Sequence, residues 1–109
     1  MLKAIHVGAG VRLIDVDEPG AFQFQDGRGK PVEDPGSLPD GSKLKLAFFL
    51  PNMAYVSIPI IKNRPPADHS WSWDGNVLLP SLTPSILTKR GGGLEDWHGY
   101  LTTGEFVPC

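Results

Sequence analysis

The chain has 109 residues, a length that fits one domain and excludes two. With 40% hydrophobic and 20% charged residues, its composition is that of a globular protein, which excludes a disordered chain. The formal net charge is -2 and the sequence holds no long run of Lys or Arg, so no nucleic-acid partner is expected.

The sequence also predicts a soluble protein of the cytoplasm. No apolar stretch approaches the roughly 18 residues of a membrane span, and residues 1–10 lack the features of a signal peptide. Cys109 is the single cysteine, which excludes an internal disulfide and fits a reducing compartment. No membrane partner is expected.

Glycine and proline dominate the fold prediction. The chain contains 13 glycines and 11 prolines, spread so that few uninterrupted helical windows are left. We therefore expect a mostly β protein: one small domain over residues 1–109, built from short antiparallel strands and hairpins with long loops and little helix.

The first half of the chain is expected to hold two hairpins, a strand and a long loop. Residues 3–7 and 11–16 are rich in β-forming side chains and predict a first hairpin. Phe22 and Phe24 alternate with glutamines, the pattern of a half-buried strand. Residues 26–42 are polar and rich in turn signals, which predicts a long surface loop, mobile or functional and the best candidate for disorder. Residues 43–50 and 55–61 follow as paired strands, with Pro59 indicating an edge or a bulge.

The second half carries the residues that chemistry would need, between positions 69 and 104. Residues 69–73 alternate as a strand, and the Asp-Gly-Asn sequence at 74–76 predicts a tight turn. Three glycines at 91–93 predict a flexible connection. Residues 97–101 and 105–107 predict a last hairpin about Thr103 and Gly104.

Ser85 and His98 form the first candidate site, a serine nucleophile with its base. A serine hydroxyl attacks a carbonyl only when an imidazole takes its proton, and a third group must orient that imidazole. Asp74 or Asp96 could orient His98. The structural alternative is that Ser85 satisfies turn backbone groups while His98 packs on Trp97.

His69, His98 and Cys109 form the second candidate, a zinc site that Asp68 or Asp96 could complete. Imidazole and thiolate suit zinc, and three protein ligands would leave an open catalytic position. The sequence contains no HExxH, no CxxC and no short ligand pair on one element, so metal is the weaker hypothesis.

Aromatic side chains form the third candidate, a recognition surface. Trp71 and Trp73 share strand parity, and with Tyr100 they could form a platform for a peptide, a sugar or a base. Asn76 and Trp97 complete the binding residues that we expect in this region. The alternative is that the tryptophans fill the core of a small domain.

Three motifs of the C-terminal third occur together in one known family. They are Trp71-Ser-Trp-Asp-Gly-Asn76, Pro80-Ser-Leu-Thr-Pro-Ser-Ile86 and Trp97-His-Gly-Tyr-Leu-Thr-Thr-Gly104. In order and spacing they resemble a family of short phage and bacterial proteins of unknown function. Some members occur in bacterial ubiquitin-like conjugation operons, where they are regarded as the deconjugating serine peptidase.

The resemblance implies a serine for catalysis at Ser85 and a histidine at His98, with a protein or peptide substrate of ubiquitin-like type. For a phage-encoded member it implies the host cytoplasm as the location. Two departures matter. Many members carry a cysteine-rich element where this chain reads Pro51-Asn52-Met53, and many continue past the last motif with a second histidine motif. If catalysis in the longer members uses that tail, the resemblance implies the fold without the activity.

The sequence thus favours a serine-dependent hydrolase without a cofactor. The rival hypotheses are a phage accessory or protein-binding module that uses the aromatic residues without chemistry, and a zinc-binding protein.

Overall fold

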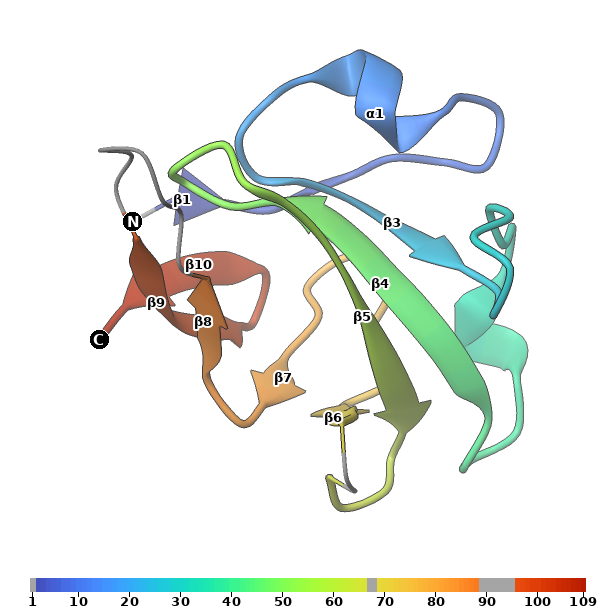
Figure 1. Cartoon of the computed structure of the whole chain (residues 1–109). Coiled ribbons are helices and arrows are strands. Elements are labelled where there is room, and N and C mark those ends of the chain that lie inside the picture. The colour runs from blue at the N-terminus through green and yellow to red at the C-terminus, as the bar shows by residue number, and fades with distance from the viewer. Residues whose placement is uncertain (1, 67–68, 89–95) are drawn as a thin grey trace.

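The computed structural model describes residues 2–66, 69–88 and 96–109, which fold into two packed β-sheets (Figure 1). The elements in chain order are β1 (Leu2–Lys3), β2 (Ile5–His6), α1 (Leu13–Val16), β3 (Ala21–Gln25), the 3-10 turn η1 (Pro35–Ser37), β4 (Lys43–Phe49), β5 (Tyr55–Lys62), β6 (Trp71–Trp73), β7 (Leu82–Thr83), β8 (Ile86–Thr88), β9 (Trp97–Thr102) and β10 (Glu105–Pro108). The mostly β fold with little helix is confirmed. None of the helices in these ranges is long and apolar enough to span a membrane.

The larger sheet has six strands in the order β2-β3-β4-β5-β6-β7. Its centre is the predicted antiparallel pair β4 and β5, with Leu46 opposite Ile58. Two contacts are parallel, β2 with β3 and β5 with β6, so the sheet is mixed. β6 pairs with β5 only from Ile60 onward, so β5 has no β6 partner at Pro59. This position suits proline, which has no N–H to donate to a neighbouring strand.

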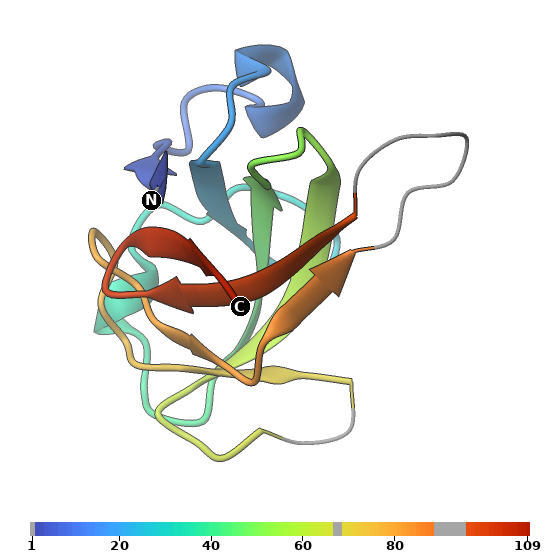
Figure 2. The same cartoon turned by 90° about the vertical axis from the view of Figure 1, so that its left-hand side faces the viewer.

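The smaller sheet has four strands in the order β1-β10-β9-β8. The predicted last hairpin is confirmed: β9 and β10 pair antiparallel about Thr103 and Gly104, which have φ values of 45° and 73°. A Cβ on Gly104 would lie 3.0 Å from the Cα of Leu79, so glycine is required there by both conformation and space. Figure 2 shows this hairpin crossing in front of the larger sheet.

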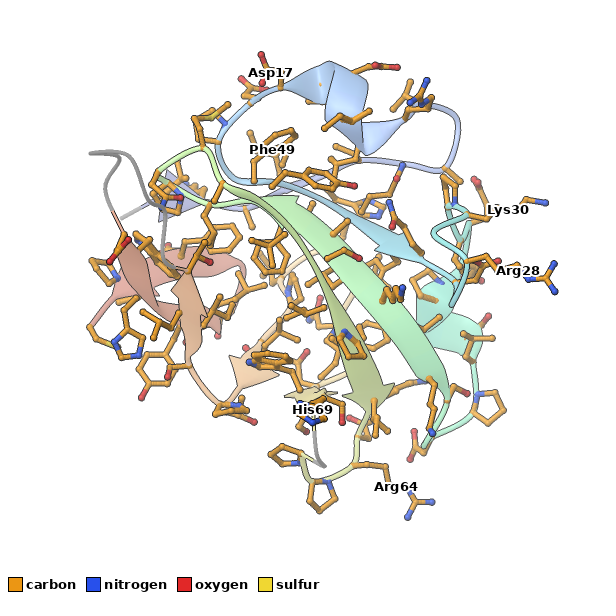
Figure 3. All side chains as sticks on the ribbon, in the orientation of Figure 1. Asp17, Arg28, Lys30, Phe49, Arg64 and His69 are labelled. Carbon is orange, nitrogen blue, oxygen red and sulfur yellow. The ribbon has the colours of Figure 1, made fainter. Side chains whose placement is uncertain are left out.

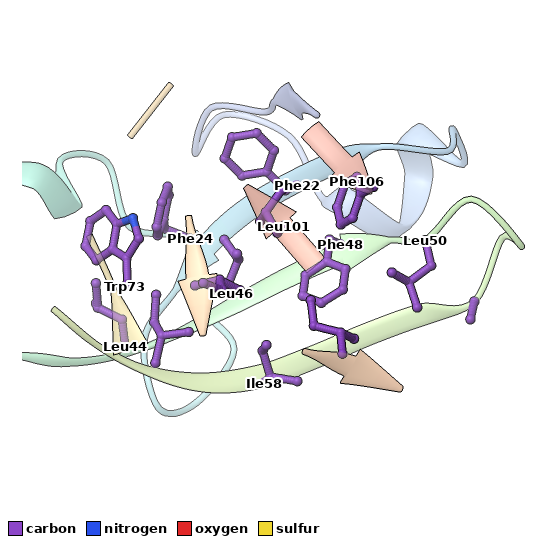
Figure 4. Packing of buried hydrophobic residues seen from close by; sticks show 14 of the residues in the cluster. Phe22, Phe24, Leu44, Leu46, Phe48, Leu50, Ile58, Trp73, Leu101 and Phe106 are labelled. Carbon is purple, nitrogen blue, oxygen red and sulfur yellow. The ribbon is translucent and has the colours of Figure 1, made fainter. Parts of the chain in front are cut away.

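The core lies between the two sheets. Leu46, Phe48 and Phe22 of the larger sheet meet Leu101 and Phe106 of the smaller one, and all five side chains are fully buried (Figure 4). The rings of Phe48 and Phe106 lie 5.7 Å apart. This contact buries the apolar face of each sheet and fixes the orientation of the smaller sheet, whose outer face stays exposed.

The predicted first hairpin is wrong. Residues 13–16 form the helical turn α1, and β2 pairs in parallel with β3 instead. A strand over 11–16 would have placed Leu13 and Val16 on opposite faces, whereas the helical turn brings both onto one apolar cluster with Ala47 and Phe49. Burial of Leu13 therefore decides the local structure.

The predicted half-buried strand is wrong in one respect, because β3 is buried on both faces. Gln23 and Gln25 are only 1% and 7% exposed. Gln23 donates to the carbonyls of Gly8 and Val11. Part of the predicted long loop pairs with the end of β3: Pro31 forms a bridge with Gln25, and Val32 donates its N–H to the carbonyl of Phe24. Residues 26–42 are therefore packed against the sheet, with η1 as their single helical turn.

Candidate functional site

Ser85 lies where the chain passes from one sheet to the other. β7 ends the larger sheet and β8 begins at the edge of the smaller one, with Pro84 and Ser85 between them. The Thr83–Pro84 peptide bond is cis. The indole Nε1 of Trp71 donates a hydrogen bond of 3.2 Å to the carbonyl of Ser85, which ties this crossing to β6. Ser85 is half-buried.

His98 is the second residue of β9 and projects from the outer face of the smaller sheet. Along β9, Trp97, Gly99 and Leu101 are buried while His98, Tyr100 and Thr102 are exposed. Gly99 is needed for this arrangement, because a Cβ there would lie 2.7 Å from the Trp97 ring and would also collide with the carbonyl of Val107. Trp97 thus folds inward beneath Gly99 and leaves the imidazole outside.

The structure brings the two predicted catalytic side chains into contact. Ser85 Oγ lies 3.0 Å from His98 Nε2, the distance of a hydrogen bond. The strand register explains the contact: Ile86 is opposite Gly99 and Leu87 is opposite His98, so Ser85 and His98 lie diagonally on one face. This is the arrangement of a nucleophile and its general base.

Cys109 joins the same imidazole from the other side. Its amide donates to the carbonyl of His98 at 3.0 Å, which continues the β10 pairing by one residue. Its Sγ lies 3.9 Å from His98 Nε2. The ring nitrogen therefore faces both a hydroxyl and a thiol. The sequence predicts Cys109 only as a metal ligand, so its place beside the dyad is a finding of the structure.

Asp74 belongs to a turn rather than to the site. Its Oδ1 accepts hydrogen bonds from the amides of Asn76 and Ser81, at 3.1 and 3.2 Å. Ser81 in turn accepts from the amide of Thr103, five residues beyond His98 on the β9–β10 hairpin. Asp74 Oδ1 thus serves a turn at the Thr103 end of the β9–β10 hairpin, and among the residues that the structure describes no contact joins Asp74 to His98.

Asp96 is in a better position to orient His98. It directly precedes β9 and is exposed. If the alternation of β9 is continued one residue back, Asp96 projects to the same outer side as His98. Of the two predicted acids, Asp96 is therefore the one that directly precedes the strand of His98 and, on this alternation, projects to the same side of the sheet.

The aromatic platform predicted from Trp71 and Trp73 does not form. Both rings lie on one face of β6 as expected, but Trp73 is fully buried and packs 4.7 Å from the ring of Phe24. Trp97 is also buried, and Trp71 is partly covered by the core. Tyr100 is the exposed member of the set, at 42%. The tryptophans fill the core because a small domain has few other large side chains.

Asn76 serves the same turn as Asp74. Its Oδ1 accepts from the amides of Leu78 and Leu79, at 3.1 and 2.8 Å, and its carbonyl accepts from the indole of Trp73. These bonds close the turn and hold Trp73 in the core, so both the Asn76 side chain and the amides after it are engaged. Asn76, which the sequence predicted as a binding residue, therefore uses its Oδ1 and its carbonyl within the turn.

The three predicted zinc ligands do not form one group: His98 and Cys109 lie together, and His69 does not join them. His69 stands beside β6 in the loop before it, with φ of 62°, while His98 and Cys109 lie on the smaller sheet (Figure 3). Within residues 2–66, 69–88 and 96–109, no group of three or more His, Cys, Asp or Glu side chains could hold a metal ion. Asp68 and the glycines at 91–93 lie outside the described residues.

Exposed apolar side chains lie beside Ser85 and His98, a feature that the sequence motifs did not indicate. Leu87, directly opposite His98, is 57% exposed, and Tyr100 stands opposite Val107 on the same outer face. The exposure of Leu87 on the outward side of an edge strand could not be inferred without the register of β8.

The chain was compared with models of known protein families, with curated proteins and with solved structures, and none of them matches it.

Proposed function

We propose that this protein is a serine-dependent hydrolase in which Ser85 is the nucleophile and His98 is the general base. The observation that carries this proposal is the 3.0 Å contact between Ser85 Oγ and His98 Nε2. Ser85 directly precedes β8 and His98 lies in β9, and 13 positions separate them in the sequence, so their contact is a product of the fold. The motif resemblance to a family with serine peptidase members supports the same assignment.

The chemistry follows from the tautomer of His98. With its proton on Nδ1, the imidazole offers the Nε2 lone pair to the Ser85 hydroxyl. The Ser85 oxygen attacks a carbonyl carbon while Nε2 takes the hydroxyl proton, and the imidazolium then gives that proton to the leaving alcohol or amine. Water, activated by the same nitrogen, releases the acyl group and restores Ser85. Asp96 is our choice for the group that orients Nδ1.

The substrate we infer is a carbonyl group on a polypeptide, in an ester, amide or isopeptide bond. The dyad lies on an exposed sheet face, beside the apolar side chains of Leu87 and Tyr100, rather than in a deep cavity. An open face admits a protein tail more readily than it holds a small molecule, since small ligands depend on enclosure for affinity. The resemblance implies a ubiquitin-like protein as the partner that carries this bond.

A fluorophosphonate probe tests the proposal, because it forms a stable bond only to an activated serine. Ser85 Oγ would displace fluoride from phosphorus with His98 taking the proton, and intact-mass analysis would show one adduct. We expect labelling to disappear in Ser85→Ala and to slow by about a hundredfold or more in His98→Ala. Ser57→Ala, an exposed serine on the larger sheet, is the matched control and should label like the wild type.

A second candidate function, a protein-binding module, is favoured by the exposure of Leu87 and Tyr100 side by side with the dyad. This function predicts that the fluorophosphonate probe forms no adduct on the folded protein. It also predicts that the protein binds a partner and that a charged residue in place of Leu87 abolishes this binding. An adduct that persists in Ser85→Ala would contradict the hydrolase proposal outright.

A further inference from the structure

A second site lies on the outer face of the larger sheet, away from the dyad. Here an open hollow of about 270 Å³ is lined by Arg12, Leu13, Ile14, Gln25, Pro31 and Tyr55, among others. Helix α1 and the loop after β3 form its walls, and the sheet forms its floor. The volume is slightly below the roughly 300–1,000 Å³ typical of ligand pockets, so it suits a small group.

The floor contains two buried glutamines whose hydrogen bonds fix their orientation. Gln23 Nε2 donates to the carbonyls of Gly8 and Val11, at 2.9 and 2.8 Å, which uses both of its N–H groups. Gln23 Oε1 can only accept, and it accepts from Gln25 Nε2 at 3.2 Å. The amide of Gln25 must therefore turn its nitrogen toward Gln23 and its oxygen away from it.

Gln25 Oε1 is an acceptor held open to the hollow. Among the residues that the structure describes, no hydrogen bond reaches this atom, and every fully buried side-chain polar atom has a partner. Oε1 therefore lies at the hollow's surface although Gln25 is only 7% exposed. Gly29 leaves the space beside it open, since a Cβ there would lie 3.9 Å from Oε1.

The walls add one cation and an apolar side. The Arg12 guanidinium faces solvent, and within the described part of the chain its one polar contact is a 4.0 Å ion pair with Asp15. Ile14 and Tyr55 are both more than two fifths exposed, at 47% and 41%. A ligand seated here would meet an acceptor on the floor, a positive charge at the rim and aliphatic and aromatic surface at the side.

We propose that this hollow binds a carboxylate that carries an adjacent N–H donor and an apolar side chain. The N–H donates to Gln25 Oε1, the carboxylate pairs with Arg12, and the side chain lies on Ile14 and Tyr55. Two sources share this chemistry: a free apolar amino acid and the C-terminal residue of a peptide. This site is independent of the dyad and of the hydrolase proposal.

Titration followed by the side-chain amide NMR signals of Gln23 and Gln25 tests the proposal on the full chain. The probes are N-acetyl-leucine, which mimics a peptide C-terminus, free leucine, and N-acetyl-leucinamide, which lacks the carboxylate. We expect N-acetyl-leucine to shift the Gln25 signals and N-acetyl-leucinamide to bind about tenfold more weakly, the effect of one lost charge-assisted contact. Binding by free leucine as well would assign the site to amino acids, and its failure would assign it to peptide ends.

Two variants keep the test decisive. Arg12→Gln changes an exposed side chain and should weaken N-acetyl-leucine about tenfold without affecting the fold. Arg28→Gln, on the neighbouring loop and pointing into solvent in Figure 3, is the matched control and should bind like the wild type. Shifts absent from Gln25 with every carboxylate probe, or equal binding of the leucinamide, would overturn the proposal.

Discussion

The indole nitrogen of Trp71 donates a hydrogen bond to the backbone carbonyl of Ser85, across a distance of 3.2 Å and 14 positions of sequence. Through this bond a residue of β6, in the larger sheet, holds the segment that delivers Ser85 to the smaller sheet. The Ser85 hydroxyl and carbonyl thus have separate anchors, His98 on one side and Trp71 on the other. In the mechanism that we propose, Trp71 is accordingly a positioning residue and does not itself take part in the chemistry.

Trp71→Phe should slow fluorophosphonate labelling of Ser85 by roughly threefold to tenfold, because a small misplacement of a nucleophile is costly. Phenylalanine keeps most of the apolar contact with the core and removes only the N–H donor. The labelling rate, measured beside a thermal melt, separates the two effects. An unchanged rate at unchanged stability would show that the bond to the Ser85 carbonyl has no positioning role.

Gly99→Ala should destabilise the protein by about 1–3 kcal/mol, the range for overpacking a tight core. The added methyl would lie 2.7 Å from the Trp97 ring and would also collide with the Val107 carbonyl. Either the β10 backbone or the Trp97 ring must therefore move. Urea denaturation followed by tryptophan fluorescence measures the loss. Gly27→Ala is the matched control, since a Cβ there would meet nothing within 4 Å.

The parts of the fold that the sequence predicted well are those governed by local alternation. Leu44, Leu46 and Phe48 alternate through β4, and the core face they define is the one observed. The last hairpin is equally readable, because Thr103 and Gly104 supply the turn and the flanking residues alternate. Helix α1 was missed because its four residues have no periodicity of their own and follow from the burial of Leu13 against Ala47 and Phe49.

For the candidate site, the residue types were predictable and the partners were not. Ser85 and His98 could be chosen from their chemistry, but whether they meet depends on the register of β8 against β9. A separate contact joins Asp74 to Ser81, and Ser81 bonds Thr103 at the far end of the hairpin. The burial of Gln23 was hidden for a similar reason, because its side-chain partners are the carbonyls of Gly8 and Val11, 15 and 12 positions away.

Cys109→Ala should leave fluorophosphonate labelling of Ser85 unchanged. Cys109 Sγ lies 3.9 Å from His98 Nε2, farther than the Ser85 hydroxyl at 3.0 Å, so the serine has the better geometry for proton transfer. Peptide mapping of the labelled protein locates the adduct. If the adduct were on Cys109, or if its removal abolished reaction, the thiol would be the nucleophile and Ser85 a bystander.

The protein should lose stability as the pH falls below about 6.5, the ordinary value for histidine. Burial beside Phe22 and Phe24 lowers the pKa of His6, and the carboxylate of Glu33 only partly opposes this shift. The unfolded chain therefore takes up a proton at a higher pH than the folded chain does. The contribution of neutral His6 to the free energy of unfolding is fully present above pH 6.5. It decreases as the pH falls toward the lowered pKa of His6 in the folded state, where the decrease levels off. Urea midpoints measured between pH 7.5 and pH 5 would show the slope, and His6→Gln should flatten it, since glutamine does not titrate. His69→Gln, which changes an exposed histidine, is the control, and an equal flattening there would contradict the assignment to His6.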